Sequence, residues 1–120
     1  MKKVQLKLVI TALTVSLMLL GCGNGFDKQG VKNSNATFKV YGNCGMCEKR
    51  IEGSLKGVSG ISHADWDQTS KMIIISYESE KISIDEMKEK IAGVGYDTES
   101  HRAKESVYSK LPECCQYERP

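Results

Sequence analysis

Apolar and polar positions follow two kinds of period along the middle of the chain. Residues 37–41 (TFKVY) and 61–67 (ISHADWD) alternate in the manner of half-buried strands, and 71–77 (KMIIISY) is the strongest strand-forming stretch. Two further segments place apolar side chains three or four positions apart, as on the buried face of a helix. These apolar positions are Cys47, Ile51, Leu55 and Val58 in the first segment and Met87, Ile91 and Val94 in the second.

Local signals indicate where these elements begin and end. Ser83 and Glu86 have the spacing of a capping box at a helix N-terminus, and Ile82 with Met87 has that of a hydrophobic staple. Glycines are expected to end both helices; they are Gly57 and Gly60 after the first and Gly93 and Gly95 at the end of the second. Residues 96–101 are then predicted to form a final edge strand.

The order strand, helix, strand, strand, helix, strand over residues 36–101 is that of a split βαβ unit. It predicts an α+β, ferredoxin-like βαββαβ sandwich, with an antiparallel four-stranded sheet and both helices on one face. Residues 22–35 are rich in Gly, Asn and other polar residues, and they are predicted to form a flexible tether. Residues 102–120 lie outside the predicted domain as a C-terminal tail with its own pair of cysteines.

Residues 1–21 combine a charged start with a short apolar run, which is the layout of a secretory signal peptide. The apolar run 8–20 is shorter than the roughly 20 residues that a membrane-spanning helix needs. It leads into Leu19-Leu20-Gly21-Cys22, which resembles the lipobox of bacterial lipoproteins, and this resemblance implies lipidation of Cys22 after cleavage. We therefore expect a lipid-anchored, extracytoplasmic protein of the bacterial cell envelope. An ordinary signal peptide and an uncleaved anchor are the alternatives.

Charge gives no reason to expect a nucleic-acid partner. The whole chain has a formal charge of +2, and without residues 1–21, which hold three lysines and no acidic residue, it has −1. The basic isoelectric point of about 8.2 therefore comes from the targeting segment. Basic residues interleaved with aromatic ones do not cluster anywhere in the sequence, so nucleic acid is excluded from the expected partners.

The cysteines beyond Cys22 form two local pairs, Cys44 with Cys47 and Cys114 with Cys115. Both pairs are too close in sequence to close a stabilising loop as disulfides. The C-x-x-C spacing of the first pair suits a soft-metal clamp, a redox-active dithiol or half of a structural zinc site.

The predicted elements favour the metal clamp. Cys44 falls in the loop after the first strand and Cys47 in the first helical turn, where unsatisfied N–H groups and the helix dipole favour thiolates. Two converging thiolates suit a soft cation of low coordination number, Cu(I) or Hg(II), because structural zinc normally takes four protein ligands. A thioredoxin-like protein would need a proline facing the disulfide, and the two prolines, Pro112 and Pro120, lie in the tail. A plain structural disulfide is the other alternative.

The strand-loop-helix placement of Cys44-Gly45-Met46-Cys47, with Gly57-Val58 and Gly95-Tyr96 after the two helices, resembles the heavy-metal-associated domain family over residues 36–101. Copper chaperones, domains of P-type metal ATPases and the periplasmic mercuric-ion binding protein belong to this family. The resemblance implies that Cys44 and Cys47 are the metal ligands. It also implies capture or delivery of metal, by thiolate exchange, to a transporter such as a P-type ATPase or an efflux system, with no catalysed reaction.

The loop departs from the family pattern G-M-x-C-x-x-C, because Tyr41 and Gly42 stand where Gly and Met are usual. In the family that Met lies under the loop and shapes it, so its absence raises the question of what shapes the loop here. Tyr96 matches a loop residue near the metal in bacterial members, which implies a supporting role beside the ligands. Met46 is interpreted as an apolar cover over the site, with a thioether ligand as the alternative.

Cys114 and Cys115 are provisional further ligands, since the tail is long enough to fold back on the first pair. The form LPxCCxY resembles tails that follow such domains in bacterial lipoproteins. A shared site of three or four sulfurs would favour Cu(I) clusters, Zn(II) or Cd(II), and the alternative is a reactive pair with an unrelated role. The expected protein binds Cu(I) first, with Hg(II) or Zn(II)/Cd(II) behind. An envelope thiol-disulfide oxidoreductase is the alternative function.

Overall fold

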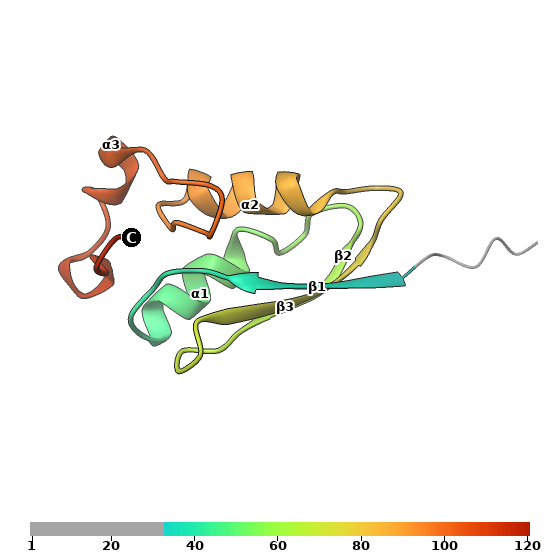
Figure 1. The fold of residues 1–120 in the computed structure, drawn as a ribbon, viewed down its shortest axis with the longest axis horizontal. Helices are drawn as coiled ribbons and strands as arrows, with labels where there is room; N and C mark the ends of the chain where they lie inside the picture. Colours follow the sequence, from blue (N-terminus) through green and yellow to red (C-terminus); the bar gives the residue numbers. More distant parts are fainter. Residues whose placement is uncertain (1–32) are drawn as a thin grey trace, which may run out of the picture. The chain divides into compact units, whose positions relative to one another are not determined.

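The computed structural model describes residues 33–120 (Figure 1). The predicted signal segment, Cys22 and most of the predicted tether lie outside this range. The prediction of a flexible tether is wrong for residues 33–35, which form a strand that pairs with residues 76–78. The elements follow one another as β1 (Asn33–Lys39), α1 (Gly45–Gly53), β2 (Ile61–Trp66), β3 (Met72–Glu78), α2 (Ile84–Gly93), α3 (Glu105–Tyr108) and a 3-10 turn, η1 (Glu113–Cys115). Among the helices of residues 33–120, none has the length and apolar character needed to cross a membrane.

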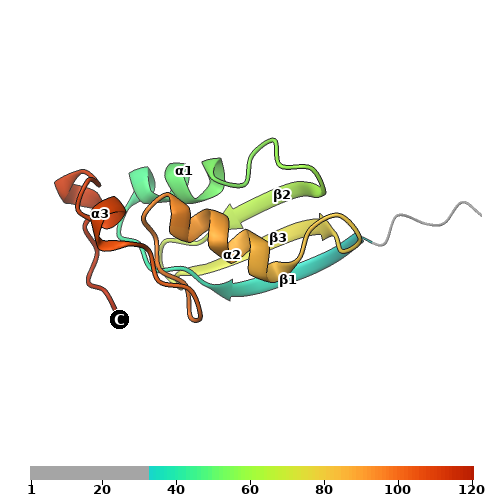
Figure 2. The ribbon, with the colours of Figure 1, turned by 90° about the horizontal axis from the view of Figure 1, so that it is seen from above.

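The sheet is antiparallel and has the order β1-β3-β2, with β3 in the middle. Buried residues alternate along β3 and in the second half of β1, whereas β2 has a register shift between Ile61 and His63. Phe38 of β1 pairs with Ile73 of β3, which also pairs with Trp66 of β2, and all three lie in the core. Ile74, on the opposite face, is 52% exposed. The buried residues of α1 and α2 belong to the same core cluster, so both helices cover one face of the sheet, as Figure 2 shows for α2. The predicted two-layer arrangement is confirmed for these elements.

The predicted fourth strand, residues 96–101, is not formed. Val40 and Thr98 make a single isolated antiparallel bridge, beside a hydrogen bond from the Tyr41 N–H to the Asp97 carbonyl (2.9 Å). The chain then turns back, because the Thr98 N–H donates to the carbonyl of His101 (2.8 Å) and the Thr98 hydroxyl accepts from the His101 N–H (3.0 Å). The described sheet therefore has three strands, and β1 keeps an almost unpaired outer edge.

The first helix is shorter than the predicted segment 47–58, since α1 ends at Gly53. Ser54 contributes to this ending, because its hydroxyl donates to the carbonyl of Ile51 (2.6 Å) and competes with helical hydrogen bonds. The chain continues in turns to Gly57 and Gly60, whose φ angles of 75° and 91° favour glycine. The predicted apolar face nevertheless reaches the core, with Leu55 buried beyond the end of the helix.

The second helix begins as the sequence predicts. The Ser83 hydroxyl accepts from the Glu86 N–H (3.2 Å), and the Glu86 carboxylate accepts from the Ser83 N–H (2.8 Å), which completes the capping box. Met87 and Ile91 are fully buried, as predicted. The prediction that Val94 shares their face is wrong: Val94 caps the end of the helix outside its last turn and is 37% exposed.

The tail, which the sequence places outside the βαββαβ unit, packs against it. Leu111, Cys115 and Tyr117 are buried in the same core cluster as the sheet. The Tyr117 hydroxyl accepts from the Asp97 N–H and donates to the Gly95 carbonyl, both at 2.8 Å, so the tail is tied to the loop after α2. In both ribbon views the tail lies at the end of the domain where α1 begins (Figures 1 and 2).

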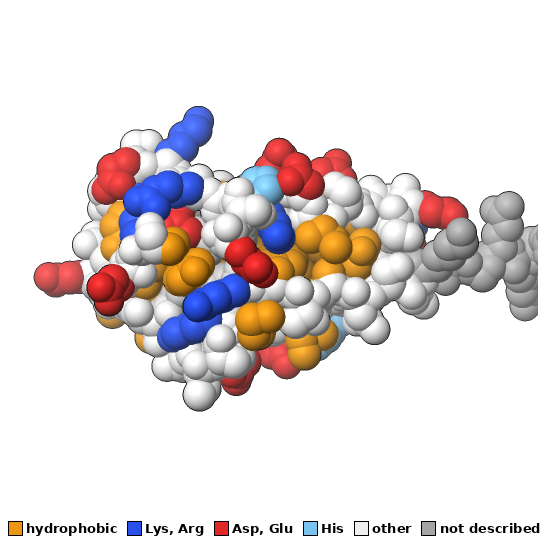
Figure 3. Space-filling view, in the orientation of Figure 1, with side chains coloured by type: hydrophobic (Ala, Val, Ile, Leu, Met, Phe, Trp, Pro, Cys, Tyr) orange, Lys and Arg blue, Asp and Glu red, His pale blue; other side chains and the backbone are white. Residues whose placement is uncertain are grey.

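Charged side chains on the face of the described residues shown in Figure 3 are interspersed by sign. Lysine and arginine side chains lie among acidic ones, and apolar side chains are visible between them. This face presents no extended surface of one charge.

Candidate metal centre

The C-x-x-C pair sits where β1 passes into α1. Cys44 is the N-cap residue, with extended backbone angles (φ −142°, ψ 176°), and Cys47 lies in the first helical turn. Cys44 is half-buried and Cys47 fully buried, and their Sγ atoms are 3.6 Å apart. The predicted convergence of these two sulfurs is confirmed.

Trp66 occupies the space beneath the loop. Its indole N–H donates to the carbonyls of Val40 (3.0 Å) and Lys71 (3.2 Å), which fixes the ring between the strands. A Cβ placed on Gly42 would lie 3.1 Å from this ring and 3.3 Å from the Cys47 Cβ. The Trp66 ring therefore fills the space under the loop and leaves no room for a side chain at position 42, where the family usually has Met.

A third sulfur joins the pair from the tail. The Sγ atoms of Cys44, Cys47 and Cys115 all lie within 4.8 Å of one another. Cys115 is fully buried in the turn η1, where its N–H donates to the carbonyl of Pro112 (2.7 Å) and its carbonyl accepts from the Tyr117 N–H (2.9 Å). The fold therefore brings together three thiols from two segments that are far apart in the sequence.

Cys114 does not enter this group. Its side chain is exposed, and its Sγ lies 3.9 Å from the Met46 Sδ and 3.9 Å from the Cys115 Sγ. Met46 is 46% exposed. The two provisional tail ligands thus have different surroundings: Cys115 faces the C-x-x-C pair and Cys114 faces Met46.

The thiols differ in their electrostatic surroundings. The backbone N–H of Cys47, in the first turn of α1, lowers the pKa of Cys44 and outweighs the partial burial that would raise it. Burial raises the pKa of Cys115 to about 12. The Cys47 sulfur accepts a hydrogen bond from the Asn43 N–H (3.3 Å). Cys44 therefore loses its proton more readily than an ordinary cysteine, and Cys115 loses its proton less readily. A bound cation would favour the thiolate form of both.

Tyr96 places a hydroxyl against the sulfurs. It is fully buried, and within residues 33–120 its hydroxyl is the buried side-chain oxygen or nitrogen that has no hydrogen-bond partner. Burial, followed by the neighbouring thiols of Cys115 and Cys47, raises the pKa of Tyr96 far above its usual range, so the group stays protonated. A buried hydroxyl without an acceptor is costly, and a thiolate sulfur beside it would supply one. The donor set and this orphan hydroxyl both fit a metal thiolate.

Residues that the sequence did not single out hold the tail at this site. The Arg119 guanidinium donates to both carboxylate oxygens of Asp97 (2.8 and 2.7 Å), and the Ala103 N–H donates to the same carboxylate (2.7 Å). Tyr117 stacks on Tyr96 with ring centroids 5.7 Å apart. A pairing between positions 97 and 119 has no local sequence signal, because it depends on how the tail folds back.

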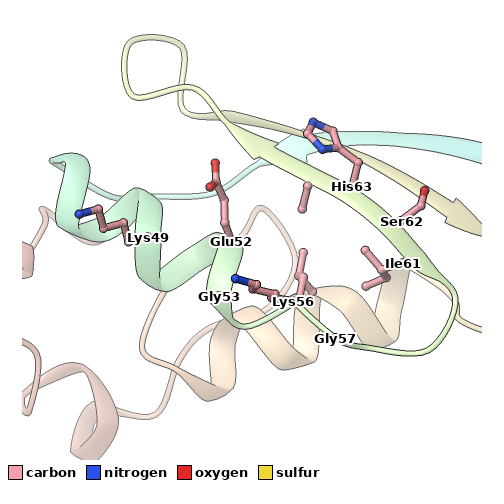
Figure 4. A pocket seen from close by; sticks show the side chains of 10 residues that line it. Lys49, Glu52, Gly53, Lys56, Gly57, Ile61, Ser62 and His63 are labelled. Atoms are coloured by element: carbon pink, nitrogen blue, oxygen red, sulfur yellow. The ribbon is translucent and has the colours of Figure 1, made fainter.

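Other clusters in the described residues have different chemistry. Two groups that could also hold a cation consist of carboxylates and one imidazole that are exposed or half-buried; they are Asp85/Glu89/His101 and Glu48/Glu52/Asp65. A pocket between α1 and β2 is lined by side chains such as Lys49, Glu52, Lys56 and His63 and contains no cysteine (Figure 4). A soft ion prefers sulfur, so the three-thiol group is the candidate for such a cargo.

The chain resembles known proteins over the part that carries the C-x-x-C pair. The family model for the heavy-metal-associated domain matches residues 37–97. The copper chaperone CopZ of Staphylococcus aureus is 30% identical over 54 residues, which are 45% of this chain and 79% of CopZ. A solved CopZ metallochaperone is 29% identical, with a TM-score of 0.52 over 54% of this chain and 98% of that one. The water-soluble region of the P-type ATPase CopA from Bacillus subtilis is 25% identical, with a TM-score of 0.54 over 57% of this chain and 46% of that one.

The matched region includes Cys44, Cys47 and Tyr96 and stops before the tail. The third thiol, Cys115, therefore lies outside the part of the chain that defines the likeness. Since the matched region takes up half of the chain and carries the paired cysteines on the expected loop and helix, this protein belongs to the heavy-metal-associated domain family.

Proposed function

We propose that this protein binds Cu(I) through the thiolates of Cys44, Cys47 and Cys115. The convergence of their three sulfurs within 4.8 Å is the observation that carries the proposal. Three thiolates suit a soft cation that accepts low coordination numbers, whereas a structural Zn(II) site would need a fourth ligand. Cys114, the remaining thiol of the described residues, faces Met46 and does not supply a fourth sulfur to the group. We therefore place Zn(II) and Cd(II) behind Cu(I) as the bound ion. Hg(II) would also fit this set of thiolates.

The task that fits this chemistry is capture of the ion and its delivery to a metal-transporting membrane protein. The likeness to the copper chaperone CopZ and to the soluble region of the P-type ATPase CopA supports such a partner. Transfer would proceed by ligand exchange: a partner thiolate bonds to the ion as one protein thiolate leaves and takes up a proton. No electron is transferred in this exchange, and only metal–sulfur bonds and thiol protons change, so no enzymatic activity is proposed.

The proposed place of action is the bacterial cell envelope, outside the cytoplasm. The support is the signal-like segment 1–21 and the lipobox-like sequence that ends at Cys22. A lipid on Cys22 would hold the domain at a membrane surface, close to a membrane-bound transporter. Metabolic labelling with a fatty acid tests this: the wild type should incorporate label, and incorporation by a Cys22→Ala variant would contradict the anchor.

A titration of the reduced protein with Cu(I) under anaerobic competition with a chelator tests the function. The wild type should compete for Cu(I), and the Cys44→Ser/Cys47→Ser double variant should lose most of this competition. A variant of the exposed Ser62, Ser62→Ala, is the matched control and should bind like the wild type. Equal binding by the double variant would contradict the proposal. Turnover of a disulfide substrate by the wild type would favour the thiol-disulfide alternative.

A further inference from the structure

Two sulfur atoms meet on the surface just outside the three-thiol group. Met46 precedes Cys47 in α1, and Cys114 precedes Cys115 in η1, so each neighbours a proposed ligand. Their side chains contact each other across 68 residues of sequence, with the Cys114 Sγ 3.9 Å from the Met46 Sδ. Both residues are exposed, in contrast to the fully buried Cys47 and Cys115.

This contact is not accounted for by packing of the core. Exposed methionines are ordinary when single, but a thioether and a thiol together are two soft donors for the same class of ion. The tail that carries Cys114 is fixed by the buried contacts of Leu111 and Tyr117 and by the Arg119–Asp97 ion pair. The position of Cys114 beside Met46 is therefore a consequence of the folded tail.

The sulfurs form a continuous series from the surface to the interior. The Cys114 Sγ lies 3.9 Å from the Cys115 Sγ, and Cys115 belongs to the group with Cys44 and Cys47. Cys44 also contacts the turn η1, since its Sγ lies 3.6 Å from the Cys114 carbonyl oxygen. An ion held at the surface pair would need to cross only one sulfur-to-sulfur step to reach the inner site.

We propose that Cys114 and Met46 form a second, exposed site for Cu(I), which receives the ion and passes it to the inner site through Cys115. The proposal rests on the proposed function, because the inner site is its destination. Binding at the surface releases the Cys114 thiol proton. In the passing step the Cys115 thiol releases its proton and bonds to the ion, the Cys114–Cu and Met46–Cu bonds break, and Cys114 takes up a proton. The Cys44 and Cys47 thiolates then bond to the ion at the inner site. The ion stays Cu(I) throughout.

The test is the stoichiometry of Cu(I) binding, measured by anaerobic titration of reduced protein against chelators of graded affinity. The wild type should bind roughly two equivalents, one of them more weakly, because one thiolate and one uncharged thioether offer fewer bonds and less negative charge than three thiolates. Cys114→Ser and Met46→Leu should each lose the weaker equivalent and keep the tighter one. Both positions are exposed, so neither substitution removes core packing. Glu113→Gln, an exposed neighbour in the same turn, is the matched control and should keep both equivalents.

The outcomes separate this proposal from the proposed function. A wild type that binds no Cu(I) would contradict both. Binding that is unchanged in Cys114→Ser and Met46→Leu would overturn the second site and leave the inner site standing. Loss of the tighter equivalent in Cys114→Ser would also overturn it, because Cys114 would then be a ligand of the inner ion.

Discussion

The buried hydroxyl of Tyr96 lacks a hydrogen-bond acceptor in the described residues. It lies beside Cys47 and Cys115. We expect Tyr96→Phe to leave the unfolding free energy of the metal-free protein nearly unchanged, because no hydrogen bond is lost. Cu(I) affinity should fall by about tenfold, which is the smallest loss typical when a hydrogen-bond partner of a metal ligand is removed. Chelator competition and denaturant unfolding of the same variant measure the two effects.

Tyr117→Phe is the matched control for Tyr96→Phe. The Tyr117 hydroxyl makes two hydrogen bonds in the interior, to the Asp97 N–H and the Gly95 carbonyl. Its removal leaves both backbone groups unsatisfied, so the unfolding free energy should fall by about 1–3 kcal/mol. A Tyr96→Phe variant that loses stability in the same way and keeps its Cu(I) affinity would show that its hydroxyl serves the fold and not the metal.

Gly42 tests whether Trp66 shapes the metal loop. Gly42→Ala brings a Cβ to 3.1 Å from the indole ring, and the resulting overpacking should cost about 1–3 kcal/mol of unfolding free energy. Gly53→Ala, whose Cβ would meet no atom within 4 Å, should instead be neutral or stabilise by up to about 1 kcal/mol. Equal stability of the two variants in chemical denaturation would contradict the assigned packing.

At the scale of single residues, the sequence predicts the site where spacing and helix position determine it. Cys44 and Cys47 could be predicted because three positions at a helix start bring two sulfurs together, and they are 3.6 Å apart. The different surroundings of Cys114 and Cys115 could not, because adjacent residues carry the same local signal. Which of the two points inward depends on the 3-10 turn and on the contacts of Tyr117 with the loop after α2.

The Arg119–Asp97 ion pair is one of the buried contacts that hold the tail against the domain. Burial alone would raise the pKa of Asp97, but hydrogen bonds from Arg119 and the Ala103 N–H together hold that pKa below its usual value. The carboxylate therefore contributes stability that is fully present above its unfolded pKa of about 3.9 and is lost as pH falls through the lower folded value. Breaking the pair should cost about 3–5 kcal/mol at neutral pH.

Unfolding of Asp97→Asn as a function of pH measures this contribution. The difference in unfolding free energy between wild type and variant should be constant from neutral pH to about pH 4 and should shrink below it. Glu105→Gln is the control, because Glu105 bonds the same arginine at 2.7 Å but its side chain is 78% exposed, so its loss should cost at most about 1 kcal/mol. A difference that stays constant into strong acid would contradict the assigned ionisation of Asp97.

At the scale of elements, periodicity and capping predict α2, β2 and β3 with small errors in their bounds. The first strand is predicted less well, because β1 begins at Asn33, four residues before its predicted start. The predicted fourth strand fails for a tertiary reason. Asp97 and Thr98 use their side chains to bind the tail and to close a turn, so the segment does not extend along β1. The first helix is shorter than predicted for a local reason. Gly53 and Ser54 favour the end of a helix, although the helical spacing of apolar residues continues to Leu55.

The whole molecule joins a heavy-metal-associated domain to a tail that closes over its metal loop. Residues 37–97 match the family, and the tail adds Leu111, Cys115 and Tyr117 to the core of that domain. The sequence predicts the two-layer fold from residues 36–101, but it cannot predict that the tail is part of the core, because its apolar residues have no period. The proposed metal site is therefore shared between the domain and the tail.

Cys115→Ser tests the tail's effect on metal transfer. Serine has nearly the same size as cysteine, so the substitution removes one of the three proposed thiolate ligands with little change in shape. Cu(I) affinity should fall by at least about tenfold, because loss of a residue that only supports a metal ligand already has an effect of this size. Transfer to a dithiol acceptor peptide should become faster, since fewer bonds to the ion must be exchanged. Stopped-flow measurement of transfer gives the rate, and a rate equal to that of the wild type would contradict a role of the tail in holding the ion.

The coordination number of the bound ion tests the central claim most directly. X-ray absorption at the copper edge, recorded on reduced protein loaded with less than one equivalent of Cu(I), counts the sulfur ligands at the inner site. We predict three sulfur ligands in the wild type and two in Cys115→Ser, with Cys44 and Cys47 remaining. Two sulfur ligands in the wild type, unchanged in Cys115→Ser, would contradict a site shared between the domain and its tail.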